Sequence, residues 1–189
     1  MKTRICVVTA GHLATTPRMV KAADALADEG YDVTVVSTQF IEWADNADRS
    51  ILASRWSRWR RSTVDYRKRG ALPRYAWSAL RMRAARQIVR ALGAKRAGVG
   101  TAGRVRERVF PELVSAVIAT RPTMIYGGGS ALASTAMAAR RAGVRFALDL
   151  EDFHSAQDAS DIYVGVTEEI ERRILPDAAL LTEIGRAHV

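Results

Sequence analysis

Residues 5–37, ICVVTAGHLATTPRMVKAADALADEGYDVTVVS, decide the fold of this chain. The segment opens with an apolar run at 5–8, continues through a turn to Pro17, and closes with a second β-branched run at 31–37. Between the runs, apolar residues recur at helical spacing as far as Gly30, a residue that favours the left-handed end of a helix. Two strands joined by a helix of this length form a right-handed βαβ unit. The segment therefore predicts an open parallel sheet.

The same alternation returns in the last third of the chain. An expected strand at 123–126 leads into the tight turn 127–130, GGGS, and an alanine-rich helix at 131–142 precedes another strand at 145–150. A short acidic helix and the start of a further strand are expected within 166–182. Repeated strand–helix units predict an α/β fold, a Rossmann-like open parallel sheet with helices on both faces.

The middle of the chain follows this alternation less clearly. Residues 41–61 show no clear period. The expected elements that follow are a short edge strand at 62–66, an amphipathic arginine-rich helix at 73–92, a glycine-rich loop at 94–103, and a helix at 105–119 that is bent or restarts at Pro111. A length of 189 residues suits one hydrophobic core. We therefore expect a single domain over 1–182, with a variable, basic, helical insert at about 41–110.

The composition is that of a folded protein with an uneven charge. Hydrophobic residues make up 48% of the chain and charged residues 26%, which excludes disordered and collagen-like classes. The net charge is +9, but residues 49–108 carry 18 Lys/Arg against two acids, whereas the remainder carries 11 against 18. The single cysteine, Cys6, indicates neither a zinc site nor a disulfide framework. No apolar run approaches the roughly 18 residues of a membrane span, so a cytoplasmic location is expected.

The basic segment 49–108 has three interpretations: a solvated surface, a surface for anionic lipid, or a surface for nucleic acid. Its helix at 74–92 combines arginines with Tyr75 and Trp77, which suits a peripheral contact with the inner face of a membrane. No helix-turn-helix, zinc finger or RNA-binding aromatic signature accompanies the charge. Nucleic acid is therefore not an expected partner.

Two turns that follow expected strands are candidate ligand sites, because open α/β sheets bind ligands at the carboxyl ends of their strands. In the first turn, Gly11 allows a ligand to approach closely, and His12 offers a donor to a phosphate or hydroxyl beside a helix N-terminus. In the second turn, Gly128, Gly129 and Ser130 lie between a strand and a helix. The alternatives are an ordinary strand-to-helix turn and close packing of the glycines against a neighbouring loop.

A third candidate site follows the strand at 145–150. Glu151, Asp152 and His154 bring two carboxylates and an imidazole to the end of this strand. Carboxylates bind sugar hydroxyls or act as bases, and a neighbouring carboxylate orients a histidine. We predict Asp152 and His154 as catalytic residues and Glu151 as a substrate contact, while Asp149 is equally well explained as a strand-end acid.

Several enzyme classes lack their motifs in this sequence. No set of His, Cys and carboxylates has metal-ligand spacing, and neither a nucleophile elbow nor a Walker loop occurs. Residues 98–103 fit G-x-G-x-x-G, but no expected strand precedes them. The turn after the first strand contains a single glycine, which makes an NAD-linked oxidoreductase the least favoured enzyme class.

Four stretches carry a family resemblance. Residues 7–23 and 30–36 resemble the amino-terminal domain of glycosyltransferase family 4, and 121–126 and 149–155 are similar to that domain's later strands and to the loop after its fifth strand. The resemblance implies a two-domain GT-B enzyme, usually metal-independent. Such an enzyme transfers a sugar from a nucleotide-sugar to an acceptor with retention of the anomeric configuration, and its amino-terminal domain mostly holds the acceptor.

The resemblance also implies positions for the candidate residues. Gly11 and His12 would face the cleft near the donor diphosphate, and Asp152 and His154 would lie near the reacting sugar and the acceptor hydroxyl. The family's nucleotide-binding carboxyl-terminal domain has no counterpart in this sequence, and the frequent second glycine beside Gly11 is missing. Residues 183–189, EIGRAHV, back-translate into what looks like a sequencing adapter, so we expect a non-native tail there.

The sequence thus predicts the amino-terminal, acceptor-side half of a retaining glycosyltransferase that acts in envelope or polysaccharide synthesis on a glycan or lipid-linked acceptor. A nucleotide-sugar is the expected co-substrate, and neither a cofactor nor a metal is expected. Because the donor domain is missing, we expect no transferase activity from this chain alone. The alternative is a non-catalytic basic module that binds an anionic membrane or nucleic acid.

Overall fold

A parallel sheet forms the centre of the molecule. The computed structural model describes residues 2–55, 58–128, 131–150 and 161–183. Within them the strands are β1 (Arg4–Thr9), β2 (Asp32–Gln39), β3 (Arg60–Asp65), β4 (Met124–Gly128), β5 (Arg145–Leu150) and β6 (Leu180–Glu183). Their order is β3-β2-β1-β4-β5-β6, and every neighbouring pair is parallel. This order confirms the predicted Rossmann-like sheet.

The central strand β1 is buried on both faces of the sheet. Val7 pairs in register with Val35 on β2 and with Tyr126 on β4, and it packs in one hydrophobic cluster with Val35 and Met19. Cys6 points to the other face and joins the larger cluster. A strand that is apolar on both sides needs helices on both sides, because either exposed face would leave apolar surface in water.

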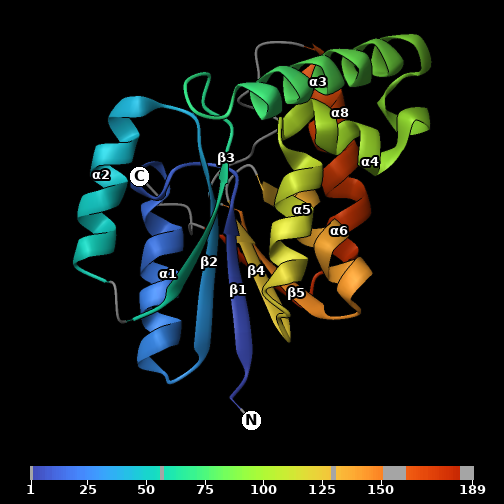
Figure 1. Cartoon of the computed structure of the whole chain (residues 1–189). Coiled ribbons are helices and arrows are strands. Elements are labelled where there is room, and N and C mark those ends of the chain that lie inside the picture. The colour runs from blue at the N-terminus through green and yellow to red at the C-terminus, as the bar shows by residue number, and fades with distance from the viewer. Residues whose placement is uncertain (1, 56–57, 129–130, 151–160, 184–189) are drawn as a thin grey trace, which may run out of the picture.

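Helices cover both faces of the sheet (Figure 1). They are η1 (Leu13–Thr15), α1 (Pro17–Asp28), α2 (Glu42–Ala53), α3 (Leu72–Leu92), α4 (Ala94–Arg106), α5 (Phe110–Ala119), α6 (Leu132–Ala142), α8 (Asp161–Ile174) and η3 (Leu175–Asp177). On one face α1 packs against β1 and β2, with α2 beside it. On the other face α5 packs against β2 and β3, and α6 against β4 and β5. The arrangement confirms the prediction of helices on both faces.

Proline and glycine set the helix ends that the sequence predicted. Pro17 lies in the first turn of α1, where its missing N–H is not needed. Gly30 has a φ of 83° just after that helix, and Gly143 adopts the left-handed conformation after α6 with a φ of 65°. Pro111 lies in the first turn of α5, so the expected restart of a helix at this residue is confirmed.

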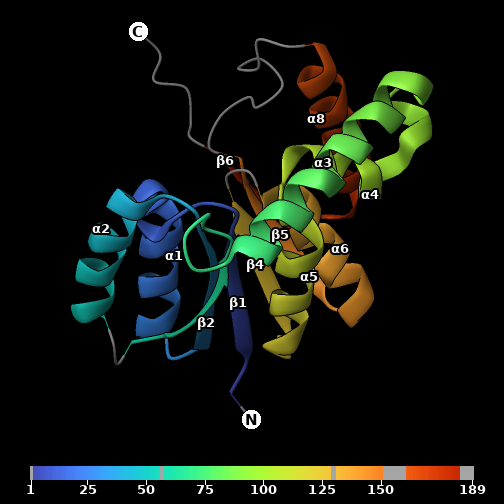
Figure 2. The same cartoon turned by 45° about the horizontal axis from the view of Figure 1, so that its top comes forward.

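The prediction of a loop at 94–103 is wrong. Those residues form most of α4, which contacts both α3 and α8 on the outer side of the molecule (Figure 2). A kink at Gly98, with a φ of 76°, interrupts the helix. A Cβ on Gly103 would lie 2.8 Å from the ring of Phe110, so this glycine allows close helix packing. Tertiary contacts thus outweigh the low helix propensity of glycine.

Residues 41–61 also contain a helix that their hydrophobic pattern does not reveal. The buried residues of α2 are Ala44, Asp45 and Asp48, and two of these three are aspartates. A search for apolar periodicity misses such a face, because its buried side chains are polar and held by ionic partners.

The predicted amphipathic helix forms as α3, but its apolar stripe faces outward. Trp77 is 59% exposed and Leu80 is 58% exposed, whereas the core side of α3 consists of Ser78, Ala85 and Val89. Contiguous exposed apolar side chains of this size mark an interaction surface more often than a solvated one. No helix in the described residues is long and apolar enough to cross a membrane.

Candidate functional site

The candidate site lies at the carboxyl ends of β1, β4 and β5. The strand order reverses direction between β1 and β4, so the connections after these two strands leave on opposite faces and open a crevice between them. Gly11 follows β1, Gly128 ends β4, and Asp149 is the penultimate residue of β5. Figure 2 turns this edge of the sheet toward the viewer.

An ion pair crosses this edge from α1 to β5. Arg18 Nε donates to Asp149 Oδ2 at 2.7 Å, and its Nη2 donates to Asp149 Oδ1 at 2.5 Å. The Thr182 hydroxyl also donates to Asp149 Oδ1 at 2.8 Å, and it lies 2.9 Å from the Tyr126 hydroxyl. Asp149 is buried, while the Arg18 side chain is 38% exposed. Asp149 is therefore the anchor that orients a half-exposed guanidinium at the crevice.

The glycines that end β4 are required by packing. A Cβ on Gly127 would lie 1.9 Å from Thr135 Oγ1, so a side chain there would push α6 away from the sheet. A Cβ on Gly128 would lie 2.5 Å from the Met19 side chain and 3.2 Å from Asp149 Cβ. The absence of both side chains lets α1 and α6 approach the edge, which supports the packing interpretation of these two glycines.

His12 is fully buried, and both of its ring nitrogens have partners within the protein. Nε2 accepts the backbone N–H groups of Phe40 and Ile41, each at 3.0 Å. Because Nε2 accepts, it carries no hydrogen, and Nδ1–H donates to Asp48 Oδ2 at 3.2 Å. The His12 ring therefore joins the segments that follow β1 and β2 to the buried face of α2.

These hydrogen bonds correct the predicted role of His12 as a donor to a ligand in the turn after β1. His12 has a packing role, and neither nitrogen is available to a phosphate or hydroxyl while these bonds persist. The Gly11 N–H donates to the Thr9 hydroxyl at 3.1 Å, and the Gly11 carbonyl accepts from the Thr38 N–H at 3.1 Å. The backbone of Gly11 thus binds the turn after β1 to β2. Arg18 is a partly exposed charged residue near this turn.

Asp48 connects His12 to a wider ionic network. Its Oδ1 accepts the Ala14 N–H at 2.8 Å, and its Oδ2 also accepts from Arg61 on β3 at 3.2 Å. Burial lowers the pKa of the Arg61 guanidinium, and the nearby Asp48 and Asp45 carboxylates oppose that shift. The network holds the loops after β1 and β2 against the edge strand β3, so it makes this side of the crevice rigid.

A carboxylate occupies the N-terminus of α6. Glu107 Oε1 accepts the backbone N–H of Ala133 at 2.8 Å and that of Ser134 at 3.2 Å. Burial raises the pKa of Glu107 to about 7, although these hydrogen bonds to Ser134 and Ala133 oppose the shift. The N-terminus of α6 is thus satisfied by an acid of this chain.

Five of the predicted site residues lie outside the described residues: Gly129, Ser130, Glu151, Asp152 and His154. Their roles stay predictions. Of the others, Gly11, His12 and Gly128 do lie together at the carboxyl edge, on the two sides of the crevice. Among the residues that the structure does describe, no group of three His, Cys, Asp or Glu side chains is arranged to hold a metal ion.

Sequence reasoning missed three charged residues, and each left a signal. Arg18 is a cation in the first turn of a helix, where the dipole disfavours it unless an acid compensates. Glu107 is one of two acids in the basic segment 49–108. Asp48 lies three residues after Asp45, on the same face of α2. In all three cases an unexpected charge indicated a specific partner, a charged side chain for Arg18 and Asp48 and the N–H groups of a helix N-terminus for Glu107.

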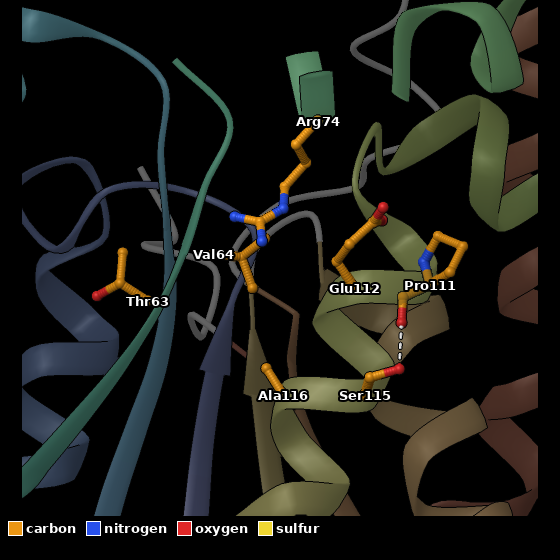
Figure 3. A pocket seen from close by; sticks show the side chains of 7 residues that line it. All are labelled: Thr63, Val64, Arg74, Pro111, Glu112, Ser115 and Ala116. Carbon is orange, nitrogen blue, oxygen red and sulfur yellow. Dashed lines mark hydrogen bonds between the residues drawn. The ribbon is translucent and has the colours of Figure 1, made fainter. Parts of the chain in front are cut away.

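A solvent-open cavity of about 470 Å³ lies beside this region, between β3, α3 and α5. Figure 3 shows Arg74 extending from α3 into the space between β3 and α5. Arg74 Nη1 donates to the Asp65 carbonyl at 2.6 Å, and Glu112 on the opposite wall accepts from Arg81 at 2.6 Å. Both charged groups of the cavity are therefore held by partners within the protein.

Comparisons with known proteins identify the fold. Arabidopsis thaliana UGT89C1 complexed with UDP matches with a TM-score of 0.52 and 15% identity, over 98% of this chain and 43% of that chain. The same protein complexed with UDP-L-rhamnose matches with a TM-score of 0.54 and 13% identity, over 98% and 45%. The calicheamicin glycosyltransferase CalG4, at a TM-score of 0.39 and 11% identity over 90% and 36%, carries no argument. No family model and no curated protein matches.

These structural similarities show which fold the chain adopts. The chain spans less than half the length of UGT89C1, and it shares the Rossmann-like α/β fold of the matched part of that structure. The predicted fold class is thereby confirmed, whereas membership of glycosyltransferase family 4 stays a prediction.

Asp48→Asn is expected to destabilise the protein by about 3–5 kcal/mol, because a neutral amide has one acceptor oxygen and cannot accept from the Ala14 N–H at one end and from His12 Nδ1–H and Arg61 at the other. Urea denaturation followed by circular dichroism measures this free energy of unfolding. The matched control is Asp28→Asn, whose carboxylate pairs with Arg58 but is 67% exposed, and which is expected to change stability by less than about 1 kcal/mol. Equal effects of the two substitutions would show that the buried network does not hold the loops.

Glu107 is expected to make the protein less stable as the pH rises. With a pKa near 7 in the folded state and 4.5 ordinarily, the folded state binds more protons between these values. The free energy of unfolding therefore falls by up to about 3 kcal/mol from pH 4.5 to 7 and levels off above. Glu107→Gln keeps an oxygen for the two N–H groups and is expected to remove this contribution, whereas Glu29→Gln on the exposed end of α1 keeps it. An unchanged pH profile in Glu107→Gln would contradict this assignment.

Proposed function

We propose that this chain is the amino-terminal, acceptor-side half of a retaining glycosyltransferase that moves a sugar from a nucleotide-sugar to an envelope or polysaccharide acceptor. The observation that carries the proposal is the polar crevice at the switch point of a sheet whose fold matches 98% of this chain to a protein solved with UDP and UDP-L-rhamnose. A ligand at the carboxyl edge of the sheet would meet the positive Arg18 side chain first.

In this proposal the chemistry is divided between two sides of the crevice. Arg18 contributes positive charge toward the departing diphosphate, and Asp149 holds the guanidinium in position. Asp152 or His154, which follow β5 in the sequence, positions or deprotonates the acceptor hydroxyl. Gly129, Ser130 and Glu151 supply further contacts to the substrate. The nucleotide-sugar acts as co-substrate, and the nucleotide-binding half lies outside the 189 residues.

The experiment begins with the source DNA. The reading frame is sequenced past the codon for Thr182, its complete product is purified, and transfer from UDP-, GDP- and dTDP-sugars is measured. Transfer by the complete product is expected, together with none by the 189-residue chain. Failure of the complete product with every donor would contradict the proposed activity, and turnover by the short chain would contradict the assignment as a half-enzyme.

Within the complete product, Arg18→Gln is expected to lower kcat/KM by about a hundredfold, because a positioned positive group at the leaving diphosphate is lost. Lys21→Gln, on the same helix and exposed, is the control and is expected to leave kcat/KM unchanged. Arg18→Gln also leaves buried Asp149 unpaired, so Arg18→Gln/Asp149→Asn is measured as well. The double variant is expected to recover stability but not activity; recovery of both would assign Arg18 a purely structural role.

A second function is supported by the outward-facing stripe of α3. We propose that α3 and α4 also attach the protein to an anionic membrane surface. Residues 72–106 carry nine Lys/Arg and no acid, and the exposed side chains on α3 include Leu72, Trp77, Leu80 and Leu92. A basic helix with an aromatic and aliphatic face is the pattern of an interfacial helix. Membrane attachment would bring a lipid-linked acceptor to the crevice.

Trp77→Ser/Leu80→Ser is expected to weaken binding to vesicles of phosphatidylcholine and phosphatidylglycerol at least about tenfold, because apolar area leaves the interface. Trp43→Ser is the control, since Trp43 is 64% exposed on α2, away from the basic helices. Co-sedimentation from about 0.05 to 0.5 M salt should show binding that weakens as the Debye length shrinks. Equal losses in the two variants, or equal binding to pure phosphatidylcholine, would reject the surface. Tighter binding to an oligonucleotide would favour the nucleic-acid alternative.

A further inference from the structure

A second cavity lies at the opposite end of the sheet from the crevice. It has a volume of about 690 Å³ and is enclosed by α4, α6, the start of β5, and α8 with η3. Arg145 is the first residue of β5 and lines this cavity, whereas Asp149 is near the other end of the same strand. Four residues of a strand span about 13 Å. The cavity is therefore separate from the site proposed for sugar transfer.

The charge of the cavity is predominantly positive. Arg140, Arg145 and Arg173 line it, and Asp177 is the single acid among its lining residues. Arg173 is held by the carboxylate of Glu169 on the same helix. The side chains of Arg140 and Arg145 make no hydrogen bond or ion pair with any other described residue. Two guanidinium groups at one rim are thus available to an anion.

The inner wall of the cavity is apolar. Phe146 is 7% exposed and Ile174 is 4% exposed, and Met137 packs against the same hydrophobic cluster. Methionine adapts its shape to irregular partners, which suits a ligand wall. The volume lies within the roughly 300–1,000 Å³ of small-molecule sites, and an apolar wall with a few polar groups is their usual composition.

We propose that this cavity binds a small, soluble, amphipathic anion. Its apolar body lies against Met137, Phe146 and Ile174, and its phosphate or carboxylate head lies between Arg140 and Arg145. Arginine suits both heads, because its planar group donates two parallel hydrogen bonds to either. An inorganic anion would leave the apolar wall uncovered, and a neutral hydrocarbon would leave the guanidinium pair unused, so the geometry selects a molecule that has both parts.

The test uses octyl phosphate below its micelle concentration, with isothermal titration calorimetry on the 189-residue chain. Octanol and inorganic phosphate are titrated separately, and each is expected to bind at least about tenfold more weakly than octyl phosphate. Arg140→Gln/Arg145→Gln is expected to weaken octyl phosphate binding by about tenfold or more. Arg141→Gln/Arg83→Gln removes the same charge from exposed positions that do not line the cavity, and it is expected to bind like the wild type.

A second variant tests the apolar wall independently. Met137→Trp fills the cavity without altering any charge, and it is expected to abolish octyl phosphate binding while the circular dichroism spectrum stays unchanged. Equal binding of octanol or of inorganic phosphate would overturn the proposal, and so would equal losses in the two double variants. Binding to phosphatidic acid vesicles is expected to be the same in both double variants. A loss there in Arg140→Gln/Arg145→Gln, with octyl phosphate binding intact, would assign the arginines to a membrane instead.

Discussion

Burial of both faces of β1 is the constraint on which the rest of the molecule depends. Cys6 and Val7 are each 0% exposed and point to opposite sides of the sheet, so neither side can be left open to water. Helices must then cover both faces, and the connections must leave β1 and β4 in opposite directions. The crevice at the carboxyl edge follows directly from that reversal, before any polar side chain is considered.

Ionic contacts convert this edge into a rigid surface. Arg18 and Asp149 join α1 to β5 across the end of β4, and His12 with Asp48 joins the loops after β1 and β2 to α2. The buried Asp149 and Asp48 carboxylates are each paired and hydrogen-bonded, which is the condition for burying a charge without a large loss of stability. Because Gly128 carries no side chain, the Met19 and Asp149 side chains can lie close to the end of β4. The groups that shape the site are therefore mostly turned inward, and Arg18 is the half-exposed one.

The outer helices α3 and α4 form a basic surface that differs from the polar carboxyl edge of the sheet. The two basic helices α3 and α4 contribute Ala85, Val89, Ala102 and Val105 to the main core, but the apolar stripe of α3 points away from it. The cavity at the amino end of β5 collects three arginines against an apolar wall. The molecule thus carries three surfaces: the crevice at the carboxyl edge of the sheet, the basic outer face, and the amino-end cavity, of which the last two share α4. Each is suited to a different ligand, since the first is polar, the second amphipathic and flat, and the third amphipathic and enclosed.

The sequence by itself determined the parallel sheet, the helices that follow β1 and β4, and their glycine and proline boundaries. These features depend on local periodicity and on the backbone preferences of single residues, which are readable along the chain. Only the tertiary structure decided that α2 is a helix, because its buried face includes Asp45 and Asp48 paired with distant charges. It also decided that 94–106 is helical and that His12 faces inward. His12 lies 36 residues from Asp48 and 28 from Phe40, and α4 contacts the distant helix α8, so no local pattern records where the folded chain brings these partners.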